Sequence, residues 1–304
     1  MGMKVLHQYT NGNVDVTIYE DGTKIREWEG DQYVEYPESC DLKITQYCDL
    51  DSICVFCHEM SNKDGKHGDL DLISKIWASQ PAGTELAIGG GNPLAHPELS
   101  SFLFRMSRQG ICPNLTINSL HLKKFSKLIR ELQEEKCFYG MGISYRGAQY
   151  MKTLPLNISY DNAVFHMILG INDFDDCKSV IDWCKENHIK PKLLLLGYKQ
   201  FGRGIDHYSE ELQTKIDQWK FHLVRLMALG GITLSFDNLA IKQLDLQKYL
   251  KRDEWDSFYL GDDGTHTFYV DAIKQEVART STSETRYKIS EDDTTVSIFN
   301  KVKQ

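Results

Sequence analysis

The sequence has no long hydrophobic run and no excess of positive charge. None of its apolar stretches approaches the roughly 20 residues that a membrane-spanning helix needs, and the longest candidates lie at 163–171 and 193–196. The 304 residues carry a net charge of -8, which disfavours a broad grip on duplex nucleic acid. The N-terminus also lacks the basic and then apolar pattern of a secretion signal. We therefore expect a cytoplasmic protein that does not insert into a membrane.

Cysteine is absent after Cys184, although the chain contains eight cysteines. Four of them fall between positions 40 and 57, and the other four are scattered. Cysteines of an intracellular protein normally stay as thiols. Scattered ones are most simply small, buried apolar residues, whereas a close group indicates a metal site. We therefore expect a metal site near the front of the chain.

No long linker, low-complexity segment or longer repeat divides the chain, so its organisation has to be read from hydrophobic patterns. Residues 1–39 predict a small β-unit, in which alternating runs at 14–19 and 24–28 flank an Asp21-Gly22 turn and a third run follows at 32–36. Residues 40–240 alternate short apolar runs with amphipathic stretches. Residues 241–304 predict a C-terminal extension, whose runs at 265–272 and 275–280 can pair.

The central part predicts an α/β fold with a parallel sheet, open or closed into a barrel. Functional groups then belong at the carboxyl ends of the strands. The candidate strands are 41–45, 85–88, 114–118, 140–144, 163–170 and 192–197, with a seventh candidate at 232–236. Two stretches between or after them have an apolar helical face, formed by Leu122, Phe125, Leu128, Ile129 and Leu132, and by Leu212, Ile216, Trp219, Leu223 and Met227.

The strongest chemical signal is the cysteine loop that follows the first of these strands. Cys48, Cys54 and Cys57 fall within ten residues, and thiolates are soft ligands that suit iron–sulfur clusters, zinc or copper. Cys40 is a poor fourth ligand, because an intervening strand at ~3.3 Å per residue places it roughly 26 Å from Cys48. The cysteines alone are equally compatible with a [4Fe–4S] cluster and with structural zinc that uses His58 or His67 as its fourth ligand.

A glycine-rich turn follows the second candidate strand. It reads Gly89-Gly90-Gly91-Asn92-Pro93, and glycines allow backbone groups to approach a ligand closely. Pro93 then restricts the chain. Such a turn is weak evidence by itself, but its place after the strand that follows the cysteine loop favours a ligand site.

Together these features resemble the radical SAM superfamily. Its members carry a three-cysteine loop after the first barrel strand, with an aromatic residue near the last cysteine, and a Gly-Gly-Glu-Pro-like turn after the second strand. Phe56 stands just before Cys57, and residues 90–93 take the place of the turn. The segments 194–204 (LLLGYKQFGRG) and 261–272 (GDDGTHTFYVDA) are similar to those of radical SAM proteins common in phages and mobile elements. The resemblance covers roughly residues 40–285.

Two departures from the family pattern concern the ligands themselves. The first gap between cysteines spans five residues, 49–53, instead of three. Asn92 replaces a glutamate that helps the family to bind the methionine amine of S-adenosylmethionine (SAM). An amide oxygen accepts a hydrogen bond but carries no charge, and charged acceptors are roughly twice as strong.

The resemblance implies a partial (β/α)6 barrel over residues 40–240. It implies one [4Fe–4S] cluster on Cys48, Cys54 and Cys57, with SAM bound to its open iron. An electron from an external donor such as flavodoxin or ferredoxin would cleave SAM to methionine and a 5′-deoxyadenosyl radical, which takes a hydrogen atom from the substrate. The cofactor-binding residues would be Phe56, Gly90, Gly91, Asn92, Pro93, Ser144, Asn172 and Tyr198.

Other polar residues are candidates for contact with SAM or substrate. Lys199 and Arg203 follow the sixth strand and can grip a carboxylate or phosphate, although they equally suit a solvated face. His266 and Asp271 can belong to a C-terminal cover over the barrel mouth, although alternating strands usually just pack. A strand-end Ser144 and a turn-forming Asn172 have equally simple structural explanations. No catalytic side chain is assigned.

Two classes of function remain. The first is a radical SAM enzyme that acts on a small molecule, a nucleotide or a nucleic-acid base. The absence of cysteines after Cys184 leaves none for the auxiliary clusters of many peptide-maturing relatives, which disfavours a peptide substrate. The alternative is a zinc or Fe–S module that binds nucleic acid or a protein partner. A third interpretation keeps the fold and cluster without SAM chemistry, and Asn92 is its only support.

Overall fold

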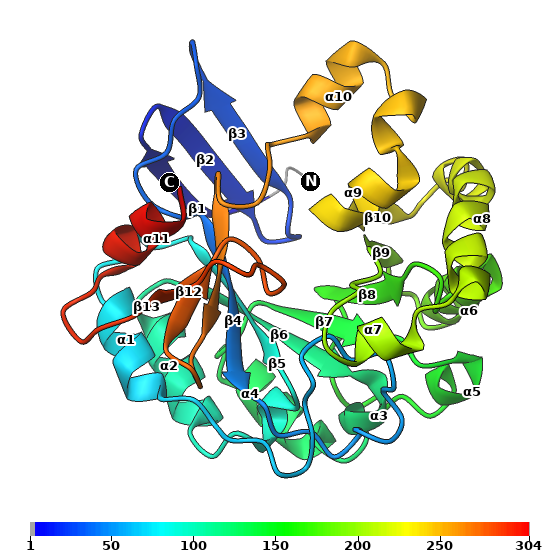
Figure 1. Cartoon of the computed structure of the whole chain (residues 1–304), viewed down its shortest axis with the longest axis horizontal. Coiled ribbons are helices and arrows are strands. Elements are labelled where there is room, and N and C mark those ends of the chain that lie inside the picture. The colour runs from blue at the N-terminus through cyan, green and yellow to red at the C-terminus, as the bar shows by residue number, and fades with distance from the viewer. Residues whose placement is uncertain (1–3, 304) are drawn as a thin grey trace.

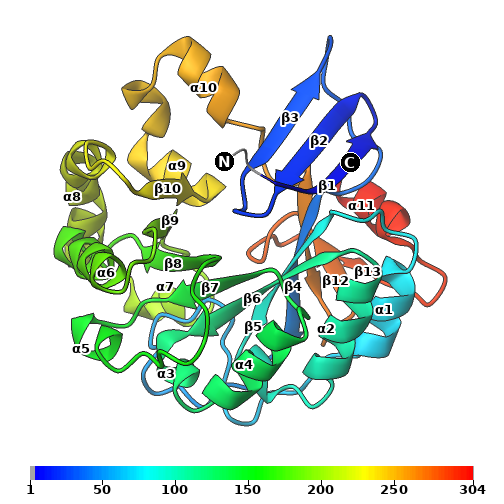
Figure 2. The same cartoon turned by 180° about the vertical axis from the view of Figure 1, so that it is seen from behind.

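A computed structural model describes residues 4–303, which form a small and a large β-sheet, with most of the helices beside the large sheet (Figures 1 and 2). Residues 1–3 and 304, the outer limits of the first and last predicted parts, lie outside the described residues. The smaller sheet consists of β1 (Val5–Asn11), β2 (Val14–Tyr19) and β3 (Lys24–Trp28) in antiparallel order.

The hairpin predicted for the β-unit is confirmed, but its third strand is different. β2 and β3 pair around the Asp21-Gly22 turn. The run at 32–36 is not a strand, because the amides of Tyr33, Glu35 and Tyr36 donate to the side-chain oxygens of Asn13 and Asn11 instead of to a neighbouring strand. The third strand is instead β1, in which buried and exposed side chains do not alternate cleanly, and it pairs with the other edge of β2.

The larger sheet has ten strands, and its order follows the chain. From one edge the order is β10-β9-β8-β7-β6-β5-β4-β11-β12-β13. Every pair of neighbouring strands from β10 to β11 in this order is parallel. β12 pairs antiparallel with both β11 and β13. The strands are β4 (Ser39–Thr45), β5 (Glu85–Gly90), β6 (Cys112–Asn118), β7 (Gly140–Ser144), β8 (Ala163–Ile168), β9 (Lys192–Leu196), β10 (Thr233–Phe236), β11 (Thr267–Asp271), β12 (Glu276–Ala278) and β13 (Tyr287–Lys288).

The predicted α/β class and the parallel sheet are confirmed, and all seven candidate strands of the central part are present as β4 to β10. Closure into a barrel is not found within residues 4–303, because β10 and β13 are the two edges of the sheet. The pairing of β11 with β12 confirms the C-terminal hairpin. β11 also pairs with β4 in parallel, which joins the C-terminal part directly to the central sheet.

Side-chain alternation gives the central strands two different faces. On β8, Phe165 and Met167 are buried, whereas Val164, His166 and Ile168 are partly open. The same alternation runs through β6, β7 and β9. The apolar face packs beneath the surrounding helices and forms the main core. The opposite face, rich in polar and small residues, is left free to line a cavity.

Helices follow most of the parallel strands and lie along the outside of the sheet (Figure 2). Several begin at a side chain that caps the free backbone amides: Asp69 precedes α1, Asp173 precedes α6 and Ser209 precedes α8. The helices are α1 (Leu70–Trp77), η1 (Pro93–Ala95), α2 (Leu99–Arg108), α3 (Ser119–Leu122), α4 (Ser126–Glu134), α5 (Ala148–Met151), α6 (Phe174–Glu186), α7 (Arg203–His207), α8 (Glu210–Met227), α9 (Asn238–Leu244), η2 (Leu246–Tyr249), α10 (Arg252–Phe258) and α11 (Thr295–Lys303).

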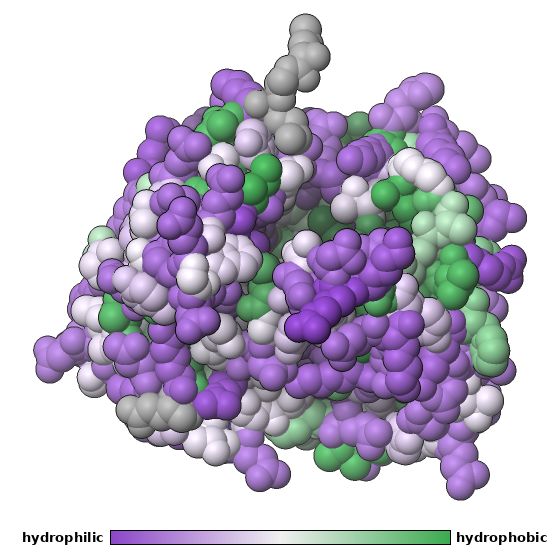
Figure 3. Space-filling model, turned by 90° about the horizontal axis from the view of Figure 1, so that it is seen from above, coloured by the Kyte–Doolittle hydropathy of each residue, from purple (hydrophilic) through white to green (hydrophobic). Residues whose placement is uncertain are grey.

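None of the helices within residues 4–303 has the length and apolar character needed to span a membrane. Seen from above the view of Figure 1, the surface is largely hydrophilic and is hollowed near its centre, where hydrophobic residues show in the depth (Figure 3).

Candidate functional site

The inner face of the large sheet borders a cavity of about 620 Å³. The cysteine loop borders it at the carboxyl ends of the strands, and Asn114, Gly140 and Asn162 border it near their amino ends. The cavity therefore runs along the strands and is not confined to their rim. Its volume is within the range of small-molecule sites.

The cysteine loop holds its three thiols over the cavity. Cys48, Cys54 and Cys57 all line it, and all three are free thiols. Backbone hydrogen bonds shape the loop: the amide of Cys48 donates to the carbonyl of Asn62 over 2.8 Å, and that of Cys54 to Leu50 over 2.8 Å. Burial, reinforced by the other two thiols, raises the pKa of Cys48 to about 11. Ligation would have to offset this preference for the protonated thiol.

Two arginines bind the backbone of the cysteine loop. Arg203 donates from Nη2 to the carbonyls of Cys54 (3.3 Å) and Ser61 (3.0 Å). Arg146 donates to the carbonyl of Ile53 over 3.2 Å, and its guanidinium lies 4.9 Å from the centre of the Phe56 ring. Both arginines and Phe56 line the cavity. Arg203, which was predicted to bind the substrate, therefore uses hydrogen-bond donors of its guanidinium to hold the loop.

The glycine-rich turn is bonded directly to the start of the cysteine loop. The amide of Gly91 donates to the carbonyl of Thr45 (2.7 Å), and that of Asn92 donates to Tyr47 (2.6 Å). A Cβ atom on Gly91 would stand 2.1 Å from the carbonyl oxygen of Tyr47, and Gly90 has a φ of +110°. Both positions thus require glycine. Gly90 and Gly91 line the cavity.

Asn92 and Pro93 end this turn, and neither lines the cavity. Pro93 is buried and begins η1. Asn92 is fully buried, and neither its side-chain oxygen nor its nitrogen has a hydrogen-bond partner. Because leaving both groups unpaired is costly, the Asn92 carboxamide is suited to a polar ligand group that enters beside the turn.

Ser144, Tyr198 and Lys199 also line the cavity. Ser144 ends β7. The Tyr198 hydroxyl donates to the carbonyl of Gly204 over 2.7 Å, so this ring forms a fixed wall. The Lys199 ammonium donates to Ser281 over 3.0 Å and thereby connects the cavity to the C-terminal part.

Besides Asn92 and Pro93, three other predicted site residues do not line the cavity. Asn172 is a turn residue whose side-chain oxygen accepts from the amide of Ile168 over 2.8 Å. His266 precedes β11, whose first residue pairs with Ser39, so it lies at the amino ends of the strands and not over the cysteine loop. Asp271 is buried, and its carboxylate accepts from the amides of Ile273 and Lys274 (both 3.0 Å). Local hydrogen bonds thus occupy the side chains of Asn172 and Asp271.

A buried charge network beside the cysteine loop was not predicted. Lys43 on β4 lies 2.6 Å from a Glu59 carboxylate oxygen and 3.5 Å from Asp271, and the Tyr269 hydroxyl donates to Glu59 over 3.2 Å. Burial alone would raise the pKa of Glu59, but His58 and Lys43 hold it well below its usual range. Lys43, Glu59 and Tyr269 all line the cavity. The network ties β11 to the loop that carries the thiols.

Two further cavity residues have no hydrogen-bond or ion-pair partner within residues 4–303. Asp41 on β4 and His166 on β8 point inward, and burial lowers the pKa of His166 to about 4. A Cβ atom on Gly142 would stand 2.4 Å from the His166 ring, so this glycine makes room for the imidazole. The alternation of side chains along a strand would have placed Asp41 and His166 on the inner face, but this inference needs the strand bounds that the structure gives.

The chain resembles known proteins in structure only. No family model and no curated protein sequence matches it. Its fold is similar to that of SuiB from Streptococcus suis. The SuiB structure bound to the precursor peptide SuiA aligns with a TM-score of 0.60 at 12% identity, over 88% of this chain and 65% of that chain. The structure bound to S-adenosylmethionine gives 0.58 at 12%, over 84% and 64%, and a third SuiB structure gives 0.58 at 11%, over 95% and 85%.

These likenesses establish a shared fold. The chain spans just under two thirds of the length of the first two SuiB chains. They do not bear on the likeness of segments 194–204 and 261–272 to phage proteins, which stays a prediction.

Proposed function

We propose that this chain is a radical SAM enzyme with one [4Fe–4S] cluster on Cys48, Cys54 and Cys57. The observation that carries the proposal is the meeting of three free thiols and the glycine turn at one end of a single cavity. The fold is similar to that of SuiB, which binds S-adenosylmethionine, and this likeness supports the proposal. In it, β4 to β9 form the six-repeat partial barrel that the family resemblance implies.

The residues present fit the implied cofactors better than they fit a single metal ion. The three thiol sulfurs do not form a group within 4.8 Å of one another, whereas ligand atoms around one tetrahedral zinc ion stand roughly 4 Å apart or less. Thiolates spread over a loop suit a cluster of several irons. The unpartnered carboxamide of Asn92 supplies a buried polar group at the position where the family binds the SAM amine.

When bound and reduced, the cluster would supply the electron that cleaves SAM to methionine and a 5′-deoxyadenosyl radical. The chain's own residues position the reactants and exclude water. Gly90 and Gly91 would let the backbone approach SAM, and the Asn92 side-chain oxygen would accept a hydrogen bond from its amine. Ser144 would contact the ribose, and Phe56 and Tyr198 would form walls of the site.

The substrate occupies the part of the cavity away from the thiols. Asp41, His166 and Lys199 offer an acid, an imidazole and a cation there. A cavity of about 620 Å³, part of which SAM fills, suits a small molecule, a nucleotide or a single base. The phage-like segments also favour modification of a nucleotide or base. A peptide is the second candidate, because SuiB binds the precursor peptide SuiA. An external carrier of the flavodoxin or ferredoxin type supplies the electron.

Anaerobic reconstitution with iron and sulfide, followed by reduction with SAM and analysis for 5′-deoxyadenosine, tests this function. We expect about four irons per chain, and 5′-deoxyadenosine above the level of the Cys57→Ala variant. Cys40→Ala is the matched control, because Cys40 is a buried thiol near the amino end of β4. It should keep its iron.

Several results would contradict the proposal. Full iron retention by Cys57→Ala would remove the cluster assignment, and iron loss in Cys40→Ala would mean that the ligand set is wrong. A cluster without 5′-deoxyadenosine would favour the third interpretation, in which the fold holds a cluster but does not cleave SAM. One tightly bound zinc ion on the three thiols would favour the zinc module.

A further inference from the structure

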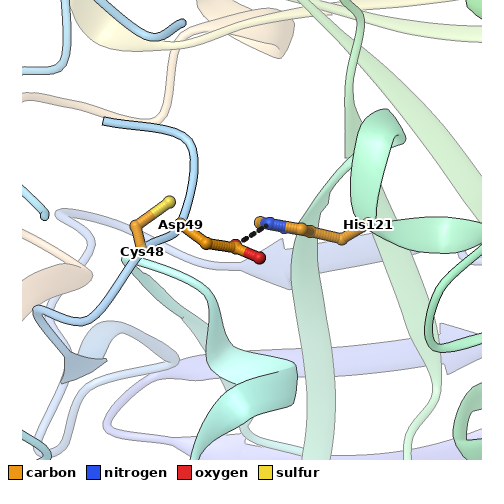
Figure 4. A group of neighbouring side chains, drawn as sticks. All are labelled: Cys48, Asp49 and His121. Carbon is orange, nitrogen blue, oxygen red and sulfur yellow. Dashed lines mark hydrogen bonds and ion pairs between the residues drawn. The ribbon is translucent and has the colours of Figure 1, made fainter. Parts of the chain in front are cut away.

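A second group of metal-ligand atoms lies beside the three thiols. The Cys48 sulfur, an Asp49 carboxylate oxygen and a His121 ring nitrogen all lie within 4.8 Å of one another. Figure 4 shows Cys48 and Asp49 side by side on the cysteine loop, facing His121 across a short gap. No other set of three histidine, cysteine or acidic ligands within residues 4–303 is as close together.

We propose that this group is a binding site for a single zinc ion, distinct in ligand set from the proposed cluster site. Zinc takes thiolate sulfur at about 2.3 Å and imidazole nitrogen or carboxylate oxygen at about 2.0–2.2 Å, in tetrahedral geometry. Its ligand atoms therefore stand roughly 3 to 4 Å apart. The three atoms already lie within 4.8 Å of one another, so small side-chain movements would close the site, with water as the fourth ligand.

The histidine of this site is held in place by its surroundings. His121 is 3% exposed and belongs to α3, whose first free amide, that of Leu120, donates to the Asn118 side chain. The His121 ring contacts the edge of Phe125, with the ring centres 6.2 Å apart. Its Nε2 atom lies 2.7 Å from an Asp49 oxygen. An ion would replace the proton shared by these two atoms and the proton of the Cys48 thiol.

One cation opposes zinc binding and can move away. The Lys124 ammonium lies 2.9 Å from the second Asp49 oxygen, and its side chain is 59% exposed. A lysine this exposed swings into solvent at little cost. While it stays, its charge repels an incoming ion, so its removal should strengthen zinc binding.

Zinc and the cluster cannot occupy the chain together, because both need Cys48. This consequence, unlike the zinc site itself, rests on the proposed function. A chain that takes up zinc first would have only Cys54 and Cys57 left for iron. Zinc is therefore expected to block cluster assembly.

Zinc titration of the reduced, metal-free chain against a competing chelator tests the site, and elemental analysis gives the stoichiometry. The chain and Cys57→Ala should each bind one zinc ion with similar affinity. His121→Ala should bind zinc roughly 100-fold more weakly, because a ligand is lost. Asp49→Asn serves as a second ligand variant, and circular dichroism verifies that both variants are folded. Lys124→Met should bind zinc about fivefold more tightly. Lys127→Met is its control, because this variant loses only an exposed ion pair with Glu131, and its zinc affinity should not change.

The outcomes separate this site from the proposed function. Zinc that survives His121→Ala and Asp49→Asn but disappears in Cys57→Ala would overturn the site and place the ion on the three thiols. Absence of stoichiometric zinc in a chain that still assembles the cluster would overturn the site alone. Zinc that depends on His121 in a chain that never assembles a cluster would overturn the proposed function and keep the site. His121→Ala, if folded, should still take up four irons and should do so in the presence of zinc.

Discussion

Asn92 is the residue at which this chain departs most clearly from the radical SAM pattern. Its buried carboxamide has no partner among the described residues. We predict that Asn92→Glu tightens SAM binding by the reconstituted chain about fivefold to tenfold, because a carboxylate accepts from an ammonium more strongly than an amide does. Without SAM, the same variant should be less stable than the unsubstituted chain, because its carboxylate is then buried without a partner.

Equilibrium SAM binding and denaturant unfolding measure these two effects. Asn172→Asp is the matched control, because the side-chain oxygen of Asn172 already accepts from the backbone amide of Ile168, whereas that of Asn92 has no partner among the described residues. Its SAM affinity should not change. Unchanged or weaker SAM binding by Asn92→Glu would show that the turn does not receive the SAM amine.

At the scale of single residues, the sequence predicted best which residues come together when their meeting depends on local spacing along the chain. Cys48, Cys54, Cys57 and the two turn glycines all line one cavity, as consecutive strand ends of a parallel sheet require. His266 was misplaced because its position depends on β11 pairing with β4, a contact between residues more than 200 positions apart in the chain. Lys43 and Glu59 were missed for the same reason, since Asp271 and Tyr269 come to them from β11.

At the scale of elements, the glycine turn after β5 and the cysteine loop after β4 behave as one unit. Gly91 packs so closely on the loop that a Cβ atom would meet the Tyr47 carbonyl at 2.1 Å. We predict that Gly91→Ala displaces the loop, lowers iron retention several-fold and costs about 1–3 kcal/mol of stability. Gly230→Ala is the control, because nothing lies within 4 Å of a Cβ atom there. Iron content after desalting and urea midpoints compare the two variants, and equal iron content would show that the contact does not shape the ligand loop.

Elements with a clear hydrophobic period were predictable, and those without one were not. The helical face assigned to Leu212, Ile216, Trp219, Leu223 and Met227 lies within a single helix, α8. The stretch from Leu122 to Leu132 instead splits between α3 and α4. Its break coincides with Lys123 and Lys124, and Lys124 reaches back to Asp49 on the cysteine loop. A tertiary ion pair of this kind leaves no periodic signal in the sequence.

At the scale of the whole molecule, the β-unit is attached to the amino ends of the central strands by polar contacts. Arg26 pairs with Glu38, which is 1% exposed, and Lys24 pairs with Glu85 at the start of β5. The Tyr139 hydroxyl donates to the carbonyl of Tyr19 over 2.7 Å. These contacts join residues far apart in sequence, so hydrophobic patterning did not reveal where the β-unit docks.

Burial makes the folded molecule resist protonation at several of its histidines. It lowers the pKa of His58, His96, His121 and His266, and it lowers the pKa of His166 to about 4. At these histidines, the unfolded chain therefore binds more protons than the folded one as the pH falls below 6.5, the ordinary pKa of histidine. Folding stability from this source is complete above that pH and is lost as the pH falls toward the folded pKa. Asp41 and Asp237, whose pKa burial raises, shift stability the other way, so a comparison of variants is needed to isolate one histidine.

His166 gives the sharpest test of this acid sensitivity, because burial alone lowers the pKa of its imidazole. Between pH 7 and pH 5, a histidine whose pKa falls from 6.5 to about 4 costs up to about 2 kcal/mol of unfolding free energy. We predict that the His166→Gln variant, whose side chain stays neutral, loses up to about 2 kcal/mol less unfolding free energy between pH 7 and pH 5 than the unsubstituted chain does. Urea unfolding of the metal-free chain in the presence of a chelator measures it. Ser235→Ala, another cavity residue without a titrating side chain, should keep the pH slope of the unsubstituted chain. Equal slopes for all three proteins would mean that the imidazole takes up its proton freely in the folded state, and hence that this part of the cavity is as wet as the solvent.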